Sequence, residues 1–278
     1  MTKKSFYYLI KIQFLGYRFH GWQKQTKHKT VHLMIDKTLN FILEKKVFKT
    51  LGSGRTDAMV SANGTAFELF IEDYQIKNLD DFLENFNFNL PQDIRALSIK
   101  EVDPVFNIIK DVKEKEYHYV FACGSKFHPF SAPLLTAIRE TLNISLMRKG
   151  ATLFQGKHNF KTYCYKPREE GTFERELSCC EIIDNTIYQA NFFPEKSYFL
   201  KVIGKGFGRH QIRLMMGALI KLGKGEIDLG YISQSLSKNN SLKMDYIAPA
   251  SGLILHQVKF RGIQFAKLVS ERRSNRVI

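Results

Sequence analysis

Cysteine is scarce in this sequence, and its spacing matches neither a metal site nor a disulfide framework. The four cysteines are Cys123, Cys164, Cys179 and Cys180. They lack the Cys-x-x-Cys spacing of structural zinc sites, and a chain of 278 residues can be stable without disulfides. Because such cysteine usage is typical of reducing compartments, we expect an intracellular, cytoplasmic protein with no metal centre.

Long apolar runs are also missing. Charged residues interrupt every apolar stretch within about ten positions, whereas a membrane-spanning helix needs about twenty. The N-terminal residues lead into an alternating pattern rather than into the apolar core of a signal peptide. We therefore expect a protein without membrane spans.

Acidic residues are few relative to basic ones. The chain has 27 Asp and Glu against 42 Lys and Arg, which is a formal net charge of +15. This balance favours a polyanionic partner, either nucleic acid or an acidic membrane surface, although a merely basic soluble protein has the same composition. Hydrophobic residues make up 44% of the chain, enough for a substantial core, which argues against bulk disorder.

Several common catalytic motifs are absent. The eight histidines include no His-Glu-x-x-His pair, and no Gly-x-Ser-x-Gly sequence occurs. The glycines between Gly204 and Gly208 lack the spacing of a nucleotide-binding loop. These absences lower the expectation of a metalloprotease, a serine hydrolase or an ATPase.

Hydrophobic periodicity predicts an α+β protein in which antiparallel strands are faced by helices. Two halves of comparable size, residues 1–110 and 111–278, follow each other without a Pro- or Ser-rich linker, so we expect them to share one sheet or a broad interface. The predicted strands are Phe6 to Phe14, Val47 to Leu51, Thr65 to Ile71, Ile94 to Val102, Glu116 to Ala122, Glu174 to Ile183, Ile187 to Phe192, Tyr198 to Ile203 and Gly252 to Phe260. The predicted helices are Val31 to Ile42, Leu79 to Phe88, Ile144 to Phe154 and Phe207 to Leu222.

The loop from Leu15 to Lys29 mixes aromatic, basic and amide side chains. Arg18, Lys24 and Gln25 suit RNA, because cations bind phosphates and amides bind bases. The alternative is a loop that its aromatic residues anchor to the core. We expect Trp22, the only tryptophan, to pack rather than to stack on a base.

The short turn Gly54-Arg55-Thr56-Asp57-Ala58 places a carboxylate beside a guanidinium between two predicted strands. An Asp in a turn is often only a backbone cap. Two flanking strands would instead present Asp57 from a rigid sheet, which suits a catalytic group.

Two distant segments offer partners for this carboxylate. Tyr117 and Tyr119 share one face of a strand and His118 points away, and a tyrosine can stack on a base and carry a proton. On the helix predicted from Phe207, Arg209 and Arg213 lie four positions apart and share a face. One of them can serve as counter-ion to the Asp, whereas an exposed arginine pair is the alternative.

Taken in order, these segments resemble the TruA family of pseudouridine synthases over nearly the whole chain. The matching segments are Phe14-Leu15-Gly16-Tyr17 with Gly21-Trp22-Gln23-Lys24-Gln25, Gly54-Arg55-Thr56-Asp57-Ala58, Asn89-Leu90-Pro91-Gln92-Asp93-Ile94, Glu116-Tyr117-His118-Tyr119, Phe154-Gln155-Gly156-Lys157-His158-Asn159-Phe160, Phe207 with His210-Gln211-Ile212-Arg213, and Ala248-Pro249-Ala250-Ser251-Gly252-Leu253.

The resemblance implies an isomerase that converts uridine to pseudouridine in the anticodon stem-loop of tRNA. It implies two related α/β halves joined in a central, largely antiparallel sheet flanked by helices, with the active-site cleft between the halves. It also implies a homodimer without metal or organic cofactor. By match, Asp57 is the catalytic carboxylate, Tyr117 the active-site tyrosine, Arg213 the partner of Asp57, and Arg55 the residue that helps displace the target base. We add Arg209 to the expected RNA contacts.

Two departures fall just beyond the catalytic turn. Met59 and Ser61 stand where the family commonly has Gly and His, and these two positions beside the catalytic turn bear on which uridine is the target. The alternatives are a related synthase acting on other RNA uridines and an RNA-binding or chaperone protein without catalysis. A carboxylate can attack C1′, add to C6 or assist proton removal at C2′, and the sequence does not choose among these.

Overall fold

The computed structural model describes residues 4–168, 170–238 and 240–265. In these residues one ten-stranded sheet runs in the order β4-β1-β3-β10-β5-β9-β8-β7, with β2 paired to β3 and β6 to β5. The strands are β1 (Ser5–Phe14), β2 (Phe48–Gly52), β3 (Ser61–Glu72), β4 (Ile94–Glu101), β5 (Val112–Cys123), β6 (Thr136–Ile138), β7 (Gly156–Asn159), β8 (Glu174–Asp184), β9 (Tyr198–Gly204) and β10 (Leu253–Phe260). The α-helices are α1 (Val31–Ile42), α2 (Leu79–Asn89), α3 (Ile144–Thr152), α4 (Gln211–Gly223) and α5 (Leu229–Ser235).

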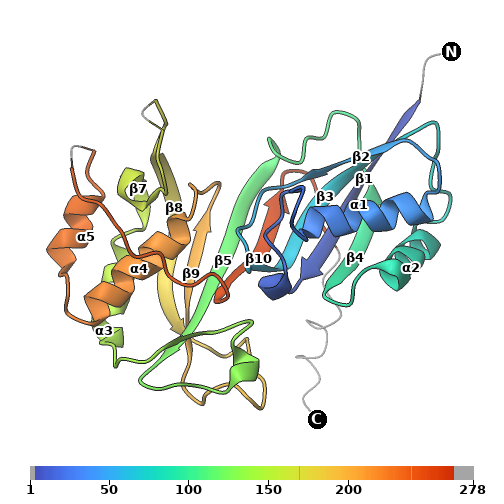
Figure 1. Ribbon diagram of the computed structural model, residues 1–278. Coiled ribbons are helices and arrows are strands. Elements are labelled where there is room, and N and C mark those ends of the chain that lie inside the picture. The colour runs from blue at the N-terminus through green and yellow to red at the C-terminus, as the bar shows by residue number, and fades with distance from the viewer. Residues whose placement is uncertain (1–3, 169, 239, 266–278) are drawn as a thin grey trace, which may run out of the picture.

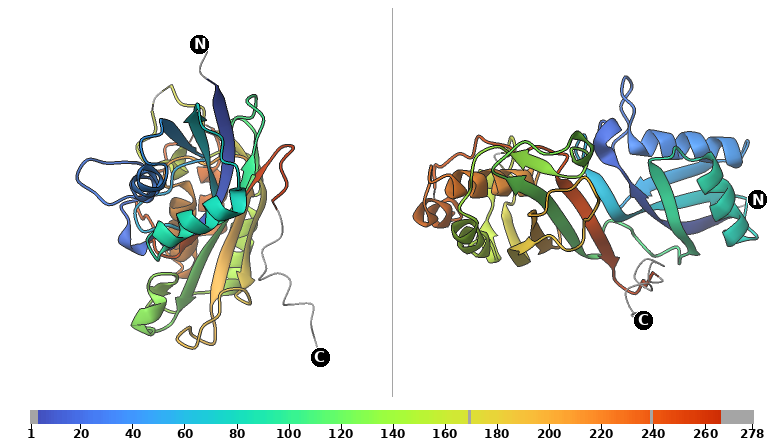
Figure 2. Two further views of the ribbon diagram at one scale, coloured as in Figure 1. Left: turned by 90° about the vertical axis from the view of Figure 1, so that its right-hand side faces the viewer. Right: turned by 90° about the horizontal axis from the view of Figure 1, so that it is seen from below.

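The helices gather in two groups along this sheet. Figure 1 shows α1 and α2 beside the strands of the N-terminal part, and α3, α4 and α5 beside those of the C-terminal part. The view from below shows the resulting elongated shape (Figure 2). All described pairings are antiparallel except β3 with β10 and β5 with β6. The predicted α+β class with a mixed, largely antiparallel sheet is therefore confirmed.

No helix in the described ranges combines the length and the apolar character that a membrane crossing requires.

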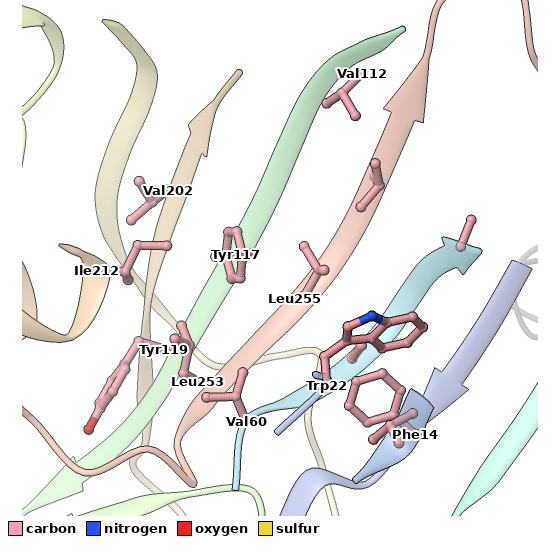
Figure 3. Packing of buried hydrophobic residues seen from close by; sticks show 14 of the residues in the cluster. Phe14, Trp22, Val60, Val112, Tyr117, Tyr119, Val202, Ile212, Leu253 and Leu255 are labelled. Atoms are coloured by element: carbon pink, nitrogen blue, oxygen red, sulfur yellow. The ribbon is translucent and has the colours of Figure 1, made fainter. Parts of the chain in front are cut away.

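The two parts of the sheet meet where the last strand returns to the middle. Strand β10 lies between β3 and β5, and its parallel contact with β3 is short: Ile254 pairs with Ser61 and Leu255 with Ala62. Buried side chains cross this junction, so that Trp22 and Phe14 lie on one side of β10 and Tyr117 on the other (Figure 3). The division at residue 110 stays a prediction, because the sheet runs on through it.

Helix α1 shows how the local sequence sets these elements. Thr30 is its N-cap, and the side-chain oxygen accepts a hydrogen bond from the Leu33 backbone N–H at 3.3 Å. Val31, Ile35 and Leu39 follow at helical spacing and are fully buried. Cap and apolar stripe agree, which is why this helix is as predicted.

Helix α4 begins later than predicted, at Gln211 rather than at Phe207. His210 precedes it in the left-handed region, with φ of 57°, and the Gln211 side-chain oxygen accepts from the Gly208 backbone N–H at 2.7 Å. The preceding glycines favour this non-helical turn. Arg209 therefore does not lie on the helix, and the predicted helical pair of Arg209 and Arg213 is wrong.

The segment from Ile187 to Phe192 forms no strand, contrary to the prediction. The Asn185 side chain turns the chain here, because its Oδ1 accepts from the backbone N–H groups of Ile187 at 3.3 Å and Tyr188 at 2.9 Å. A side chain that satisfies local N–H groups competes with sheet pairing.

Candidate active site

The turn that carries Asp57 connects β2 to β3 and is held by the loop before α1. The Trp22 backbone N–H donates to the Thr56 carbonyl at 3.1 Å, and the Met59 N–H donates to the Phe19 carbonyl at 3.0 Å. Gly21 allows this approach: it has φ of +84°, and a Cβ there would lie 2.6 Å from the Thr56 carbonyl oxygen. The loop before α1 therefore holds the turn that carries Asp57 in place.

Two side chains from the C-terminal half contact the Asp57 carboxylate. Arg213 Nη1 lies 3.3 Å from Asp57 Oδ2, and His210 Nε2 lies 3.3 Å from Oδ1. Arg213 is itself held in place, since its Nε donates to the Ala248 carbonyl at 2.8 Å. The structure therefore brings the predicted Asp57 and Arg213 together from positions 156 residues apart.

His210 was not singled out from the sequence, although it belongs to the matched segment before Arg213. Its left-handed backbone turns the imidazole toward Asp57, and the ring stacks on Tyr165 with centroids 4.8 Å apart. Burial lowers the pKa of His210, outweighing the opposite effect of the Asp57 charge. A neutral imidazole can donate its Nε2–H to Asp57 while Arg213 supplies the positive charge.

Tyr117 stands on β5 (Figure 3). Its ring packs edge-on against Phe207, with ring centroids 5.2 Å apart. Burial raises its pKa, and the Asp57 charge acts in the same direction, so the ring is a neutral phenol at physiological pH. Its hydroxyl has no hydrogen-bond partner in the described part of the chain. Tyr119 differs, because its hydroxyl donates to the Pro249 carbonyl at 2.7 Å.

The side chains predicted to contact RNA differ in exposure and in the partners they already have. Arg55 and Arg209 are exposed, and the Arg209 guanidinium lies 4.9 Å from the Tyr165 ring centroid. Arg18 already pairs with Asp93 at 2.8 Å and Lys24 pairs with Asp36. Gln25 donates from its Nε2 to the His20 carbonyl at 3.0 Å.

The two departures beyond Asp57 occupy different environments. Met59 is half-exposed and has φ of 67°, a conformation that favours glycine, the residue common in the family at this position. Ser61 is buried, and its hydroxyl accepts from the Gly16 backbone N–H at 2.9 Å. Ser61 therefore anchors the loop before α1 to β3.

A second polar cluster lies on the opposite face of β5. Ligand-type atoms of Glu116, His118 and His256 all lie within 4.8 Å of one another. His118 Nε2 is 2.8 Å from Glu116 Oε1 and its Nδ1 is 2.8 Å from the Tyr188 hydroxyl, which lies 3.1 Å from His256 Nδ1. The two imidazoles stack face to face, at 4.1 Å and 16°. Since stacked rings do not aim their nitrogens at one point, a hydrogen-bonded network accounts for this cluster.

Comparison with known proteins shows which family this chain belongs to. A family model described as tRNA pseudouridine synthase matches residues 151–261. The tRNA pseudouridine synthase A 2 of Desulfotalea psychrophila is 31% identical over 92% of this chain and 98% of its own. The tRNA pseudouridine synthase A proteins of Phytoplasma mali and Pseudothermotoga lettingae are each 30% identical, over 92% and 91% of this chain and 99% of their own. This chain belongs to the tRNA pseudouridine synthase A family.

Proposed function

We propose that this protein isomerises uridine to pseudouridine in the anticodon stem-loop of tRNA, with Asp57 as the catalytic carboxylate. The observation that carries the proposal is the position of Asp57 between Arg213 and His210, on the same side of the sheet as Tyr117. The +15 net charge supports an RNA substrate, whose phosphates it would bind.

The reaction is an isomerisation, so substrate and product have the same atomic composition. The N1–C1′ bond breaks, the uracil turns, C5 joins C1′ and the C5 proton is lost while N1 gains one. Asp57 acts as an anion held by the Arg213 guanidinium, and attack at C1′, addition at C6 and proton removal at C2′ are all open to it. The neutral Tyr117 ring offers a stacking surface for the uracil and a hydroxyl for proton transfer late in the reaction.

The RNA must present its base outside the stack, which costs a few kcal/mol and less in a loop. Arg55 is exposed on the turn that carries Asp57, so we assign it to displacing the base. Arg209, Arg18 and Lys24 are assigned to the RNA backbone, where Arg18 and Lys24 exchange their Asp partners for phosphates, and the Gln25 amide is assigned to a base. We further propose a homodimer, which sedimentation velocity tests.

The decisive experiment is an Asp57→Ala variant assayed for pseudouridine formation and for tRNA binding. We expect no pseudouridine and unchanged binding, because the carboxylate performs chemistry and does not attract the RNA. Activity in this variant would overturn the mechanism.

Mapping pseudouridine in cells with and without the protein tests the substrate. Loss at anticodon-stem positions of tRNA supports the proposal, and loss confined to other RNAs contradicts it.

A further inference from the structure

Lys115 is a partly buried lysine on the active-site face of β5 that lacks a carboxylate partner among the described residues. Its Nζ donates to the Ser53 carbonyl oxygen at 2.9 Å, which is the one hydrogen bond its ammonium makes in this part of the chain. An ammonium has three N–H donors, so two remain for a ligand. Burial lowers the pKa of Lys115, in keeping with the missing counter-ion.

The position of this cation ties it to the catalytic turn. Lys115 is two residues before Tyr117 on the same strand and therefore points to the same face. A Cβ added at Gly54 would lie 2.5 Å from Lys115 Nζ, so the ammonium lies directly against the start of the turn that carries Asp57. Across the sheet it pairs with Gly204 of β9, at the start of the segment that leads to His210.

The same turn also offers backbone donors. No described acceptor receives a hydrogen bond from the backbone N–H groups of Arg55 and Thr56. A lysine beside unpaired N–H groups is the chemistry that binds phosphate in many proteins. A partly buried cation without a partner is costly, and a ligand that brings a negative charge removes this cost.

We propose that Lys115 and the Gly54–Thr56 backbone form a subsite for a phosphodiester group of the RNA, next to the target uridine. The inference rests on the proposed function, because uracil itself is neutral and only the RNA backbone brings a charge into the cleft. The carbonyl of Ser53 orients the ammonium, and the phosphate takes the two remaining donors.

The chain supplies a matched control in Lys259. Val258 of β10 pairs with Lys115 and the next residue, Lys259, pairs with Glu114, so Lys259 lies on the opposite face of the same two strands. Its Nζ is 2.6 Å from Glu114 Oε1. The two lysines therefore differ in the face of the sheet and in the presence of a carboxylate.

The test measures tRNA binding against salt for the full-length protein and its Lys115→Gln, Lys115→Arg and Lys259→Gln variants. For K115Q we expect weaker binding and a slope of log K against log salt that is smaller by about 0.7–0.9, the value for one phosphate contact. K115R and K259Q should keep the slope of the unchanged protein. A K115Q slope equal to that of the unchanged protein overturns the proposal even if turnover falls, since Lys115 would then only support the turn through Ser53.

A second measurement covers the case in which K115Q folds poorly. A single methylphosphonate beside the modified uridine removes one charge from the RNA and leaves the protein intact. We expect it to lower the slope for the unchanged protein at one of the two flanking phosphates, and an unchanged slope at both contradicts the subsite. The salt dependence of tRNA binding is measured independently of turnover. If the mapping experiment finds no pseudouridine that depends on this protein, the proposed function is refuted, whereas the phosphate subsite is still decided by the binding slopes.

Discussion

At the scale of single residues, the ion pair between Asp57 and Arg213 is only partly shielded from water. The Asp57 side chain is 30% exposed and that of Arg213 is 15% exposed. Removing one partner of a fully buried pair costs about 3–5 kcal/mol, whereas an exposed pair contributes about 1 kcal/mol or less. The access of water fits a carboxylate that has to meet a substrate.

An Arg213→Gln variant should therefore lose stability by an intermediate amount, about 1–3 kcal/mol. Both Asp57 and the Ala248 carbonyl lose a charged donor in this variant. Urea unfolding measures the stability, and pseudouridine formation should fall much more than tRNA binding does. Equal losses of binding and turnover would show that Arg213 serves RNA affinity instead.

At the scale of elements, successive side chains of β5 point to opposite faces of the sheet, and the two faces carry different chemistry. Lys115 and Tyr117 face the site, and Glu116 and His118 face the network on the other side of the sheet. The hydrogen bond from His118 is the main cause that lowers the pKa of Glu116, and the charges of His256, His118 and Lys201 contribute in the same direction.

The lowered pKa of Glu116 predicts that the Glu116→Gln substitution changes stability in a pH-dependent way. A carboxyl whose pKa is lowered by folding stabilises the protein above its unfolded value, about 4.3, and loses this contribution as the pH falls through the folded pKa. At pH 7 the variant should be less stable by about 1 kcal/mol, the difference between a charged and a neutral acceptor. Urea unfolding in steps from about pH 7 into the acid range checks this, and a stability difference that does not shrink as the pH falls would refute it.

At the scale of the whole molecule, the two parts of the chain share one core. Buried residues form a continuous cluster from Trp22 and Phe14 to Tyr117 and Ile212 (Figure 3). The pairing of β10 with both β3 and β5 and the contacts to Asp57 add links across the junction. These links favour unfolding in one step.

Trp22 provides a local probe for this prediction. It is the only tryptophan, it is buried, and it packs on Phe14 and His32 of the N-terminal part, so its fluorescence reports the packing around these residues. Far-UV circular dichroism reports all helices and strands. We expect both signals to give the same urea midpoint, whereas an earlier Trp22 transition would show that residues 1–110 unfold separately.

Much of the fold follows from local pattern. The helices at Val31 and Leu79 lie close to their predicted ranges, because the N-caps Thr30 and Asn78 agree with the apolar periodicity. The strands β1, β2, β4 and β8 also lie close to their predicted ranges. The prediction fails where a side chain or a backbone turn competes, at the start of α4 and after Asn185. There, specific hydrogen bonds outweigh periodicity.

The sequence by itself determined the family and the fold class, and it singled out Asp57, Tyr117 and Arg213 as candidate site residues, since these depend on residue types in a collinear order. Only the tertiary structure decided what surrounds the carboxylate. Strand β10 returns from the end of the chain and joins β3 to β5. This junction brings His210 and Arg213 to Asp57. It also brings Lys115 to Ser53. Contacts between residues so distant in sequence depend on how the whole sheet closes, and no local pattern carries that information.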